Sequence, residues 1–218
     1  MMSSKITLVY VYDPLCGWCY GFHPVMEKLA DRFKNQLNVR VVSGGLAIDE
    51  NAQPISEGYS YINSSLEIVE KKTGITFGEP FVQLVEEGSY FYDSLPGCKA
   101  QNAVNRLAPE QSLKFAGAMQ KAFFNNGENL NKLDTYLSIL EDFHVDPAEF
   151  EAVYTSDEIE KITRDQFEWV HQNKASAFPA LLLKIGADTG LMSKGYRPYD
   201  TLESHLHHLI RNIERMDI

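Results

Sequence analysis

Two of the three cysteines in this chain lie in the segment Cys16-Gly17-Trp18-Cys19. An apolar run from Ile6 to Tyr12 comes before this segment, and a helical pattern from about Val25 to Phe33 comes after it. Two thiols with two residues between them, at a junction between a strand and a helix, can close to a disulfide and open again. The spacing and its context therefore predict a redox-active dithiol.

The two cysteines are predicted to have different roles. A thiolate, and not a thiol, attacks a disulfide. Cys16 falls at the expected start of a helix, where unpaired backbone N–H groups and the helix dipole stabilise a thiolate. Cys19 lies one turn further along and faces the same side. Cys16 is therefore the predicted nucleophile and Cys19 the predicted resolving thiol, while Gly17 and Trp18 between them are expected to tune the reduction potential.

Two other interpretations of the cysteine pair must be weighed. A lone CxxC segment is half of a zinc site, and Cys98 with one of His23, His144 or His171 would be needed to complete it. No second CxxC and no HxxxH-type pair accompanies the first, which is unlike the paired spacing of structural zinc sites. The cysteines would otherwise be two ordinary buried residues. The strand-CxxC-helix context favours redox chemistry over both, and the prediction includes no metal.

The elements around the dithiol predict a βαβ unit. Ile6–Tyr12 is rich in β-branched and aromatic residues and is expected to be a strand buried on both faces. The segment from Val39 to Val42 is a second strand, closed by Gly44-Gly45, and it is expected to pair in parallel with the first. Pro24 is expected to kink the intervening helix or to restart it.

The middle of the chain has a different pattern. Helical periodicity recurs between about Ile48 and Asn173. Strand signals return at Ala180–Ile185 and at Leu191–Tyr196, and an amphipathic helix over Tyr199–Met216 closes the chain. The predicted fold class is therefore α/β: one domain made of residues 1–47 and 174–218, with an all-helical insertion at residues 48–173 between its βαβ and ββα halves.

The segment from Tyr12 to Gly21, which reads YDPLCGWCYG, resembles the active site of the DsbA-like branch of the thioredoxin superfamily. Within that branch it is most similar to the cytoplasmic FrnE-like group. The resemblance implies a thioredoxin fold split by a helical insertion after the second strand. It also implies a cis-proline that faces the dithiol, and Phe178-Pro179 matches that proline in position. The family commonly has a small or β-branched residue before this proline, so the bulky Phe178 is a departure that puts the substrate in question.

The resemblance and the dithiol together predict a thiol-disulfide oxidoreductase, acting as a disulfide reductase or isomerase through a mixed disulfide. Cys98 and His23 are candidate modulators of the redox pair, and Cys98 is otherwise expected to be a small buried residue. Histidines like His23 are more often partly exposed and structural. Trp18, Tyr12, Phe22 and Phe178 are candidates for an apolar rim that holds a client.

Composition restricts the partners. The formal net charge is −10 and the pI is about 5.1, which argues against nucleic acid or an anionic membrane as the main partner. Three cysteines are too few for a disulfide-stapled secreted scaffold. No cleavage-site pattern follows the first apolar stretch, so a cytoplasmic location is expected. The expected partner is a disulfide-containing protein or a small thiol, without a cofactor except for glutathione as an electron donor or substrate.

Two further classes remain open. The same split fold resembles the kappa glutathione transferases and the hydroxychromene carboxylate isomerases, which bind glutathione and typically have a serine in place of Cys16. The intact cysteine pair argues against this class, while Phe178 and the large insertion are compatible with it. The other class is a non-catalytic thioredoxin-like binding module in which the cysteines are incidental. The oligomeric state is not predicted.

Overall fold

The computed structural model describes residues 6–216, without the side chains of residues 59–61, 214 and 216. A mixed four-stranded sheet has the strand order β2-β1-β5-β6, in which β1 pairs in parallel with β2 and antiparallel with β5. The sheet and its two associated helices are β1 (Ile6–Tyr12), α1 (Gly17–Arg32), β2 (Leu37–Ser43), β5 (Ala180–Ile185), β6 (Asp188–Lys194) and α9 (Tyr199–Met216). These elements form the βαβ and ββα halves of the predicted thioredoxin fold, and the predicted fold class is confirmed.

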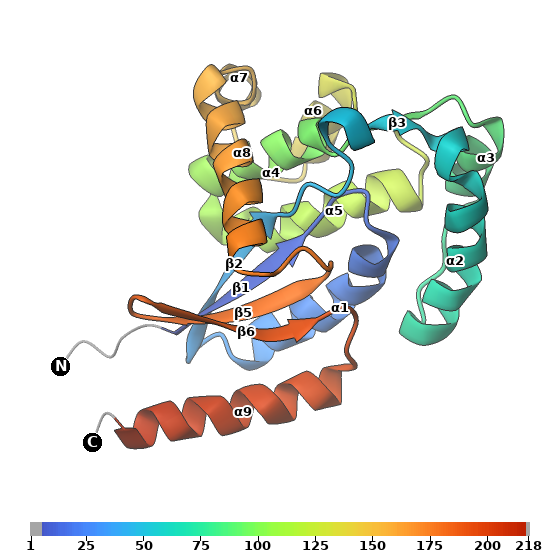
Figure 1. Cartoon of the computed structure of the whole chain (residues 1–218). Coiled ribbons are helices and arrows are strands. Elements are labelled where there is room, and N and C mark those ends of the chain that lie inside the picture. Colours follow the sequence, from blue (N-terminus) through green and yellow to red (C-terminus); the bar gives the residue numbers. More distant parts are fainter. Residues whose placement is uncertain (1–5, 217–218) are drawn as a thin grey trace.

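The segment between β2 and β5 is helical apart from one short ladder. Its helices are α2 (Tyr59–Thr73), α3 (Glu79–Glu87), α4 (Leu95–Leu107), α5 (Ser112–Phe124), α6 (Leu133–Leu140), α7 (Pro147–Tyr154) and α8 (Asp157–Gln172), with short 3-10 turns at Asp49–Asn51, Ile55–Gly58 and Pro109–Gln111. The ladder pairs β3 (Gln53–Pro54) with β4 (Phe91–Tyr92). The β3–β4 ladder was not predicted, because strands of two residues are too short to show a periodic pattern. Figure 1 shows α9 below the sheet and helices α4 to α8 above it, with α2 and α3 to the right.

Strand β1 is buried on both faces, as predicted, because each face packs against different helices. Leu8, Tyr10 and Tyr12 belong to the large buried cluster that includes residues of α1, α5 and α9. Val9 and Val11 point to the opposite face and belong to a smaller cluster with residues at the end of α8. The alternation of side chains along a strand thus places β1 at the centre of the protein, and its last residue leads directly to the dithiol.

Helix α1 begins before Pro24, so one of the two predicted effects of this proline, a restart of the helix, is wrong. It is one helix from Gly17 to Arg32 with Pro24 inside it, and it does not restart at the proline. A proline costs the helix one hydrogen bond. Here the buried face of the helix compensates, since Phe22, Met26 and Leu29 are fully buried on both sides of the proline. Tertiary packing has overridden a local helix-breaking signal.

Candidate active site

Cys16 is the N-cap residue of α1. Its backbone is extended (φ −86°, ψ 108°), and its carbonyl oxygen accepts hydrogen bonds from the N–H groups of Cys19 at 2.9 Å and Tyr20 at 3.0 Å. The Cys16 sulfur itself accepts from the Cys19 N–H at 3.2 Å. The sulfur therefore lies at the positive end of the helix, against an amide proton that stabilises a thiolate.

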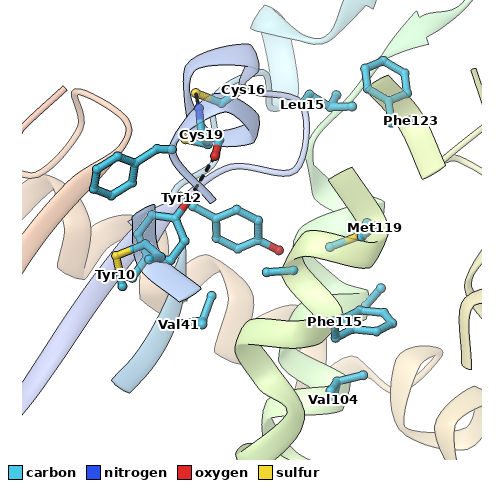
Figure 2. Packing of buried hydrophobic residues seen from close by; sticks show 14 of the residues in the cluster. Tyr10, Tyr12, Leu15, Cys16, Cys19, Val41, Val104, Phe115, Met119 and Phe123 are labelled. Carbon is cyan, nitrogen blue, oxygen red and sulfur yellow. Dashed lines mark hydrogen bonds between the residues drawn. The ribbon is translucent and has the colours of Figure 1, made fainter. Parts of the chain in front are cut away.

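Cys19 lies one turn deeper and in a different environment. It is completely buried, whereas Cys16 keeps 6% of its surface exposed. Burial, followed by the proximity of Cys16, raises the pKa of the Cys19 thiol well above its ordinary value. Figure 2 shows both sulfurs at the start of α1 above Tyr10, whose hydroxyl donates to the Cys19 carbonyl oxygen at 3.4 Å. Cys19 is therefore held as a protonated thiol, and only Cys16 is placed to be attacked or to attack.

Asp13 fixes the turn that presents Cys16. Its buried carboxylate accepts hydrogen bonds from the Leu15 N–H at 2.9 Å, the Leu46 N–H at 2.7 Å and the Ser94 hydroxyl at 2.9 Å. These donors belong to the dithiol turn, the loop after β2 and the start of α4. No role in the site was predicted for Asp13. An acid directly after a buried strand and before CxxC was the available signal, but its partners are distant in sequence.

The Asp13 carboxylate leads to a pH-dependent prediction. Burial raises its pKa, against the opposing effect of the three hydrogen bonds. A raised pKa in the folded protein means that folding favours the protonated carboxyl. Its contribution to the free energy of unfolding is complete below the unfolded-state pKa of about 3.9, and it is lost as the pH rises through the folded-state pKa. We therefore subtract the free energy of unfolding of Asp13→Asn from that of the wild type. This difference should decrease as the pH rises above about 4.

Urea unfolding of both proteins at a series of pH values measures that difference. Because both proteins share every other titrating group, the subtraction isolates Asp13. A difference that grows with pH would show that the folded protein favours the ionised carboxylate, contrary to the effect of burial.

The two candidate modulators are both buried, which was expected for Cys98 but not for His23. The Cys98 sulfur lies 3.8 Å from an Asp13 carboxylate oxygen, and burial together with that carboxylate raises its pKa well above the ordinary value. His23 was expected to be partly exposed, yet only 8% of its surface is accessible because its ring packs on Gly117 of α5. Burial lowers its pKa, although Glu27 lies 3.6 Å away. A redox role for Cys98 or His23 stays a prediction.

Phe178 and Pro179 lie in the loop that leads into β5. The peptide bond between them is cis, Pro179 is buried, and its carbonyl oxygen accepts the Gly195 N–H at 2.8 Å. The Phe178 ring lies on Gly44, where an added Cβ would stand 2.4 Å from the ring. The missing side chain at Gly44 therefore gives the bulky ring a place to lie beside the dithiol.

A pocket of about 290 Å³ opens beside Cys16. Its lining residues come from the dithiol, the loop after β2, α2, α3, α5 and the loop before Pro179: Cys16, Gly17, Trp18, Leu46, Ile62, Ser65, Leu66, Val69, Phe77, Phe81, Phe124, Ser176, Ala177 and Phe178. Among the lining residues that the structure describes, none is charged. We call this the Cys16 pocket.

The predicted apolar rim is half correct. Trp18 and Phe178 line the Cys16 pocket, but Tyr12 and Phe22 are fully buried in the core and line no part of it. Phe22 points inward from α1, and the Tyr12 hydroxyl donates to Gln101 Oε1 at 2.6 Å. Much of the remaining wall comes from α2, Phe77, Phe81 and Phe124, for which no role in the site was predicted.

The other candidate zinc ligands do not gather near the dithiol. Within residues 6–216, no group of three or more His, Cys, Asp and Glu side chains is arranged to hold a metal ion. His144 and His171 lie in the insertion, and His205 and His208 are exposed on α9. In the same described range, no helix has the length and apolar composition needed to cross a membrane.

A sheet split by a helical insertion, with a CxxC pair at the start of its first helix, defines the thioredoxin class. The chain belongs to the DSBA-like thioredoxin domain family, whose model matches residues 7–207. The predicted resemblance to DsbA-like proteins is thus confirmed, while the FrnE-like subgroup stays a prediction.

Three known proteins are similar to this chain. A candidate protein disulfide isomerase from Nitrosomonas europaea is 29% identical, with a TM-score of 0.85 over 95% of this chain and 98% of that one. The cytosolic disulfide reductase DsbM from Pseudomonas aeruginosa is 23% identical, with a TM-score of 0.79 over 94% of this chain and 98% of that one, and it was also solved with GSH. The ClpXP adapter protein SpxH from Halalkalibacterium halodurans is 23% identical over 88% of this chain, which spans only 63% of SpxH.

Proposed function

We propose that this protein is a thiol-disulfide oxidoreductase that reduces or isomerises client disulfides. The observation that carries the proposal is the unequal environment of the two thiols. The Cys16 sulfur lies at a helix N-terminus with a backbone N–H 3.2 Å away, while Cys19 is buried and its pKa is raised. This is the asymmetry that a nucleophile and a resolving thiol require.

The reaction has two exchanges. The Cys16 thiolate attacks one sulfur of the client disulfide, so that a bond to Cys16 forms and the client bond breaks. The other client sulfur leaves as a thiolate and takes up a proton. Cys19 then loses its proton and attacks the Cys16 sulfur, which releases the second client thiol. The client gains two electrons and becomes two thiols, and the protein becomes a disulfide that an external thiol must reduce.

The expected compartment sets the direction of electron flow. In a reducing cytoplasm the dithiol would be mainly reduced, so that reduction or isomerisation exceeds net oxidation. The name of DsbM as a cytosolic disulfide reductase is consistent with this direction, although its likeness to this chain is limited to the fold. We extend both the cytoplasmic location and the reductive direction to this chain as part of the proposal.

The Cys16 pocket supports a client with an apolar group near its disulfide. Its lining is dominated by Leu46, Leu66, Phe77 and Phe124, and its volume of about 290 Å³ is suited to one large side chain. A client cysteine bound to Cys16 would place a neighbouring aromatic or aliphatic side chain in this pocket. The buried apolar surface would hold the mixed disulfide until Cys19 attacks.

A small-molecule reaction with glutathione is the second candidate function. The position of the Cys16 pocket directly beside the Cys16 sulfur and the GSH in a DsbM structure favour it. Turnover of an aromatic electrophile with glutathione that survives Cys19→Ser would support this function over dithiol exchange, because conjugation needs no resolving thiol.

Capture of the mixed disulfide tests the proposal. Cys19→Ala leaves Cys16 able to attack and removes the second step, so client proteins should remain attached to Cys16 through a bond that a reductant breaks. Mass spectrometry of the captured species identifies the attached cysteine. The matched control is Cys16→Ser with Cys19→Ala, which should capture nothing. Equal capture by the two variants would rule out Cys16 as the nucleophile.

Gly44 is predicted to control the size of the client group. A methyl at this position would lie 2.4 Å from the Phe178 ring, so Gly44→Ala must push the ring toward the Cys16 pocket. Overpacking of this kind typically costs about 1–3 kcal/mol, and we expect kcat/KM for a disulfide peptide with a neighbouring aromatic residue to fall about tenfold. A small dialkyl disulfide, which does not fill the pocket, should be reduced at nearly the wild-type rate.

The double variant Gly44→Ala/Phe178→Ala is the control for this prediction. Removal of the ring should restore the reduction of the aromatic peptide if the ring is what blocks the pocket. If the double variant is as slow as Gly44→Ala alone, the methyl acts by another route.

A further inference from the structure

A second hollow adjoins the Cys16 pocket. It has a volume of about 640 Å³ and is lined by His171, Gln172, Lys174, Ser176, Ala177 and Lys194. Ser176 and Ala177 also line the Cys16 pocket, so the two hollows meet across the short loop that leads to Phe178 and Pro179. We call the second hollow the basic hollow. A molecule whose disulfide reaches Cys16 would pass close to it.

The backbone holds both lysines in fixed places relative to this loop. Lys194 ends β6 directly opposite Ala180, and the next residue, Gly195, donates its N–H to the Pro179 carbonyl oxygen at 2.8 Å. Lys174 donates its N–H to His171 at 3.0 Å and has a left-handed backbone with φ 55°. A residue other than glycine is uncommon in that region. Lys174 therefore lies at the start of the loop, and Lys194 lies opposite its end.

The charged residues that line the basic hollow, Lys174 and Lys194, are both positive. Its described lining contains no acidic residue, and within residues 6–216 neither lysine forms an ion pair. Other basic residues of this chain, whose net charge is −10, do form ion pairs: Arg32, Lys34, Lys99, Arg106, Lys161 and Arg164. Two lysines without an acidic partner, in a hollow that adjoins the Cys16 pocket, are thus an electrostatic feature that a bound anion would complete.

We propose that the basic hollow binds a carboxylate of the substrate, so that the preferred substrate is a disulfide with a carboxylate a few bonds from the reacting sulfur. The inference rests on the proposed dithiol function and names its substrate class. Lys174 and Lys194 recognise the carboxylate while the apolar part of the substrate occupies the Cys16 pocket. Either glutathione disulfide or an acidic residue next to a client cysteine can supply such a carboxylate.

Pairs of substrates that differ only in a carboxylate or an amide measure how much the substrate's negative charge contributes to its reduction. A cysteine peptide with a neighbouring glutamate and its glutamine analogue are each joined by a disulfide to the same reporter thiol. Glutathione disulfide is measured beside its tetraamide, in which all four carboxylates are converted to amides. We expect the wild type to reduce each carboxylate form faster than its amide. Lys174→Gln or Lys194→Gln should each lower kcat/KM for the carboxylate form about threefold, and the double variant about tenfold, as for exposed ion pairs. The amide forms should not change, and added salt should reduce the preference.

Lys184→Gln is the control variant. Lys184 lies on β5 but lines a different cavity, so it changes the net charge equally without touching the basic hollow. Loss confined to glutathione disulfide would assign the carboxylate to glutathione, and loss confined to the glutamate peptide would assign it to a protein client. An equal loss for carboxylate and amide forms, or an equal effect of Lys184→Gln, would overturn the proposal.

A binding measurement keeps this test independent of catalysis. Thioether analogues of the two peptides cannot exchange, and titration calorimetry should give a weaker Kd for the glutamate analogue with the double lysine variant and an unchanged Kd for the glutamine analogue. If no disulfide is reduced in a Cys16-dependent way, the proposed function fails while this titration still decides the carboxylate site. If both analogues bind equally to both proteins, the carboxylate site is wrong whatever the activity.

Discussion

Cys16→Ser is expected to lower the rate of disulfide reduction by on the order of 10³-fold or more, because a hydroxyl is far less nucleophilic than a thiolate at neutral pH. The helix N-terminus that stabilises a thiolate cannot ionise a serine to a comparable extent. Cys19 cannot substitute for Cys16, since it is fully buried and its pKa is raised. The measurement is insulin reduction with a thiol reductant under steady-state conditions.

Cys98→Ser is the matched control for Cys16→Ser. It also exchanges one sulfur for oxygen in a buried place, but its sulfur lies beside Asp13 and not at the start of α1. We expect it to keep most of the activity. Cys19→Ser should retain a single exchange with a reporter disulfide while losing turnover. Insulin reduction that persists in Cys16→Ser would favour a binding module over a dithiol enzyme.

Gly78→Ala is expected to cause the largest loss of stability among the substitutions considered, about 2–4 kcal/mol in the free energy of unfolding. Gly78 precedes α3 and crosses the end of α5, where an added Cβ would stand 1.9 Å from the Asn125 carbonyl oxygen. The obstacle is backbone and cannot rotate away. The crossing must therefore separate, which also moves Phe77 and Phe81 away from Phe124 in the wall of the Cys16 pocket.

Gly190→Ala controls for the general effect of adding a methyl. A Cβ at Gly190 would have no atom within 4 Å, and the residue lies on the exposed strand β6. Urea unfolding should show a change of less than about 0.5 kcal/mol for Gly190→Ala, as for most surface substitutions. A stability for Gly78→Ala within that range would show that α3 and α5 separate at little cost.

Local patterns were sufficient for the elements that carry the dithiol. The buried strand Ile6–Tyr12, the strand Ala180–Ile185 and the closing helix from Tyr199 were predicted with their correct bounds. Each strand is a short apolar run next to turn residues, and the helix has a clear amphipathic period. The parallel pairing of Ile6–Tyr12 with the next strand, at Val39 to Val42, followed from the order of the elements. Cys16 could be placed at a helix start for the same reason.

The rest of the site depends on contacts between distant segments. The burial of His23 is due to Gly117 on another helix, and the sequence around His23 shows no sign of it. The Cys16 pocket combines Leu66, Phe77 and Phe124 from separate helices, each of which looked like ordinary core packing. Only the tertiary arrangement distinguishes an apolar side chain that lines a pocket from one that fills the core.

The network around Asp13 has a consequence for modularity. The Ser94 hydroxyl donates a hydrogen bond to the Asp13 carboxylate in the dithiol turn. The Tyr92 hydroxyl of β4 donates to the Leu15 carbonyl oxygen, next to Cys16. Both partners belong to the segment between β2 and β5. A minimal protein made by joining the outer parts of the chain would therefore keep its cysteines but lose the Ser94 hydroxyl, one of the donors to the buried Asp13 carboxylate, and the Tyr92 hydroxyl that donates beside Cys16. Grafting this active site onto another thioredoxin scaffold would need the start of α4 and the β4 tyrosine to be moved with it.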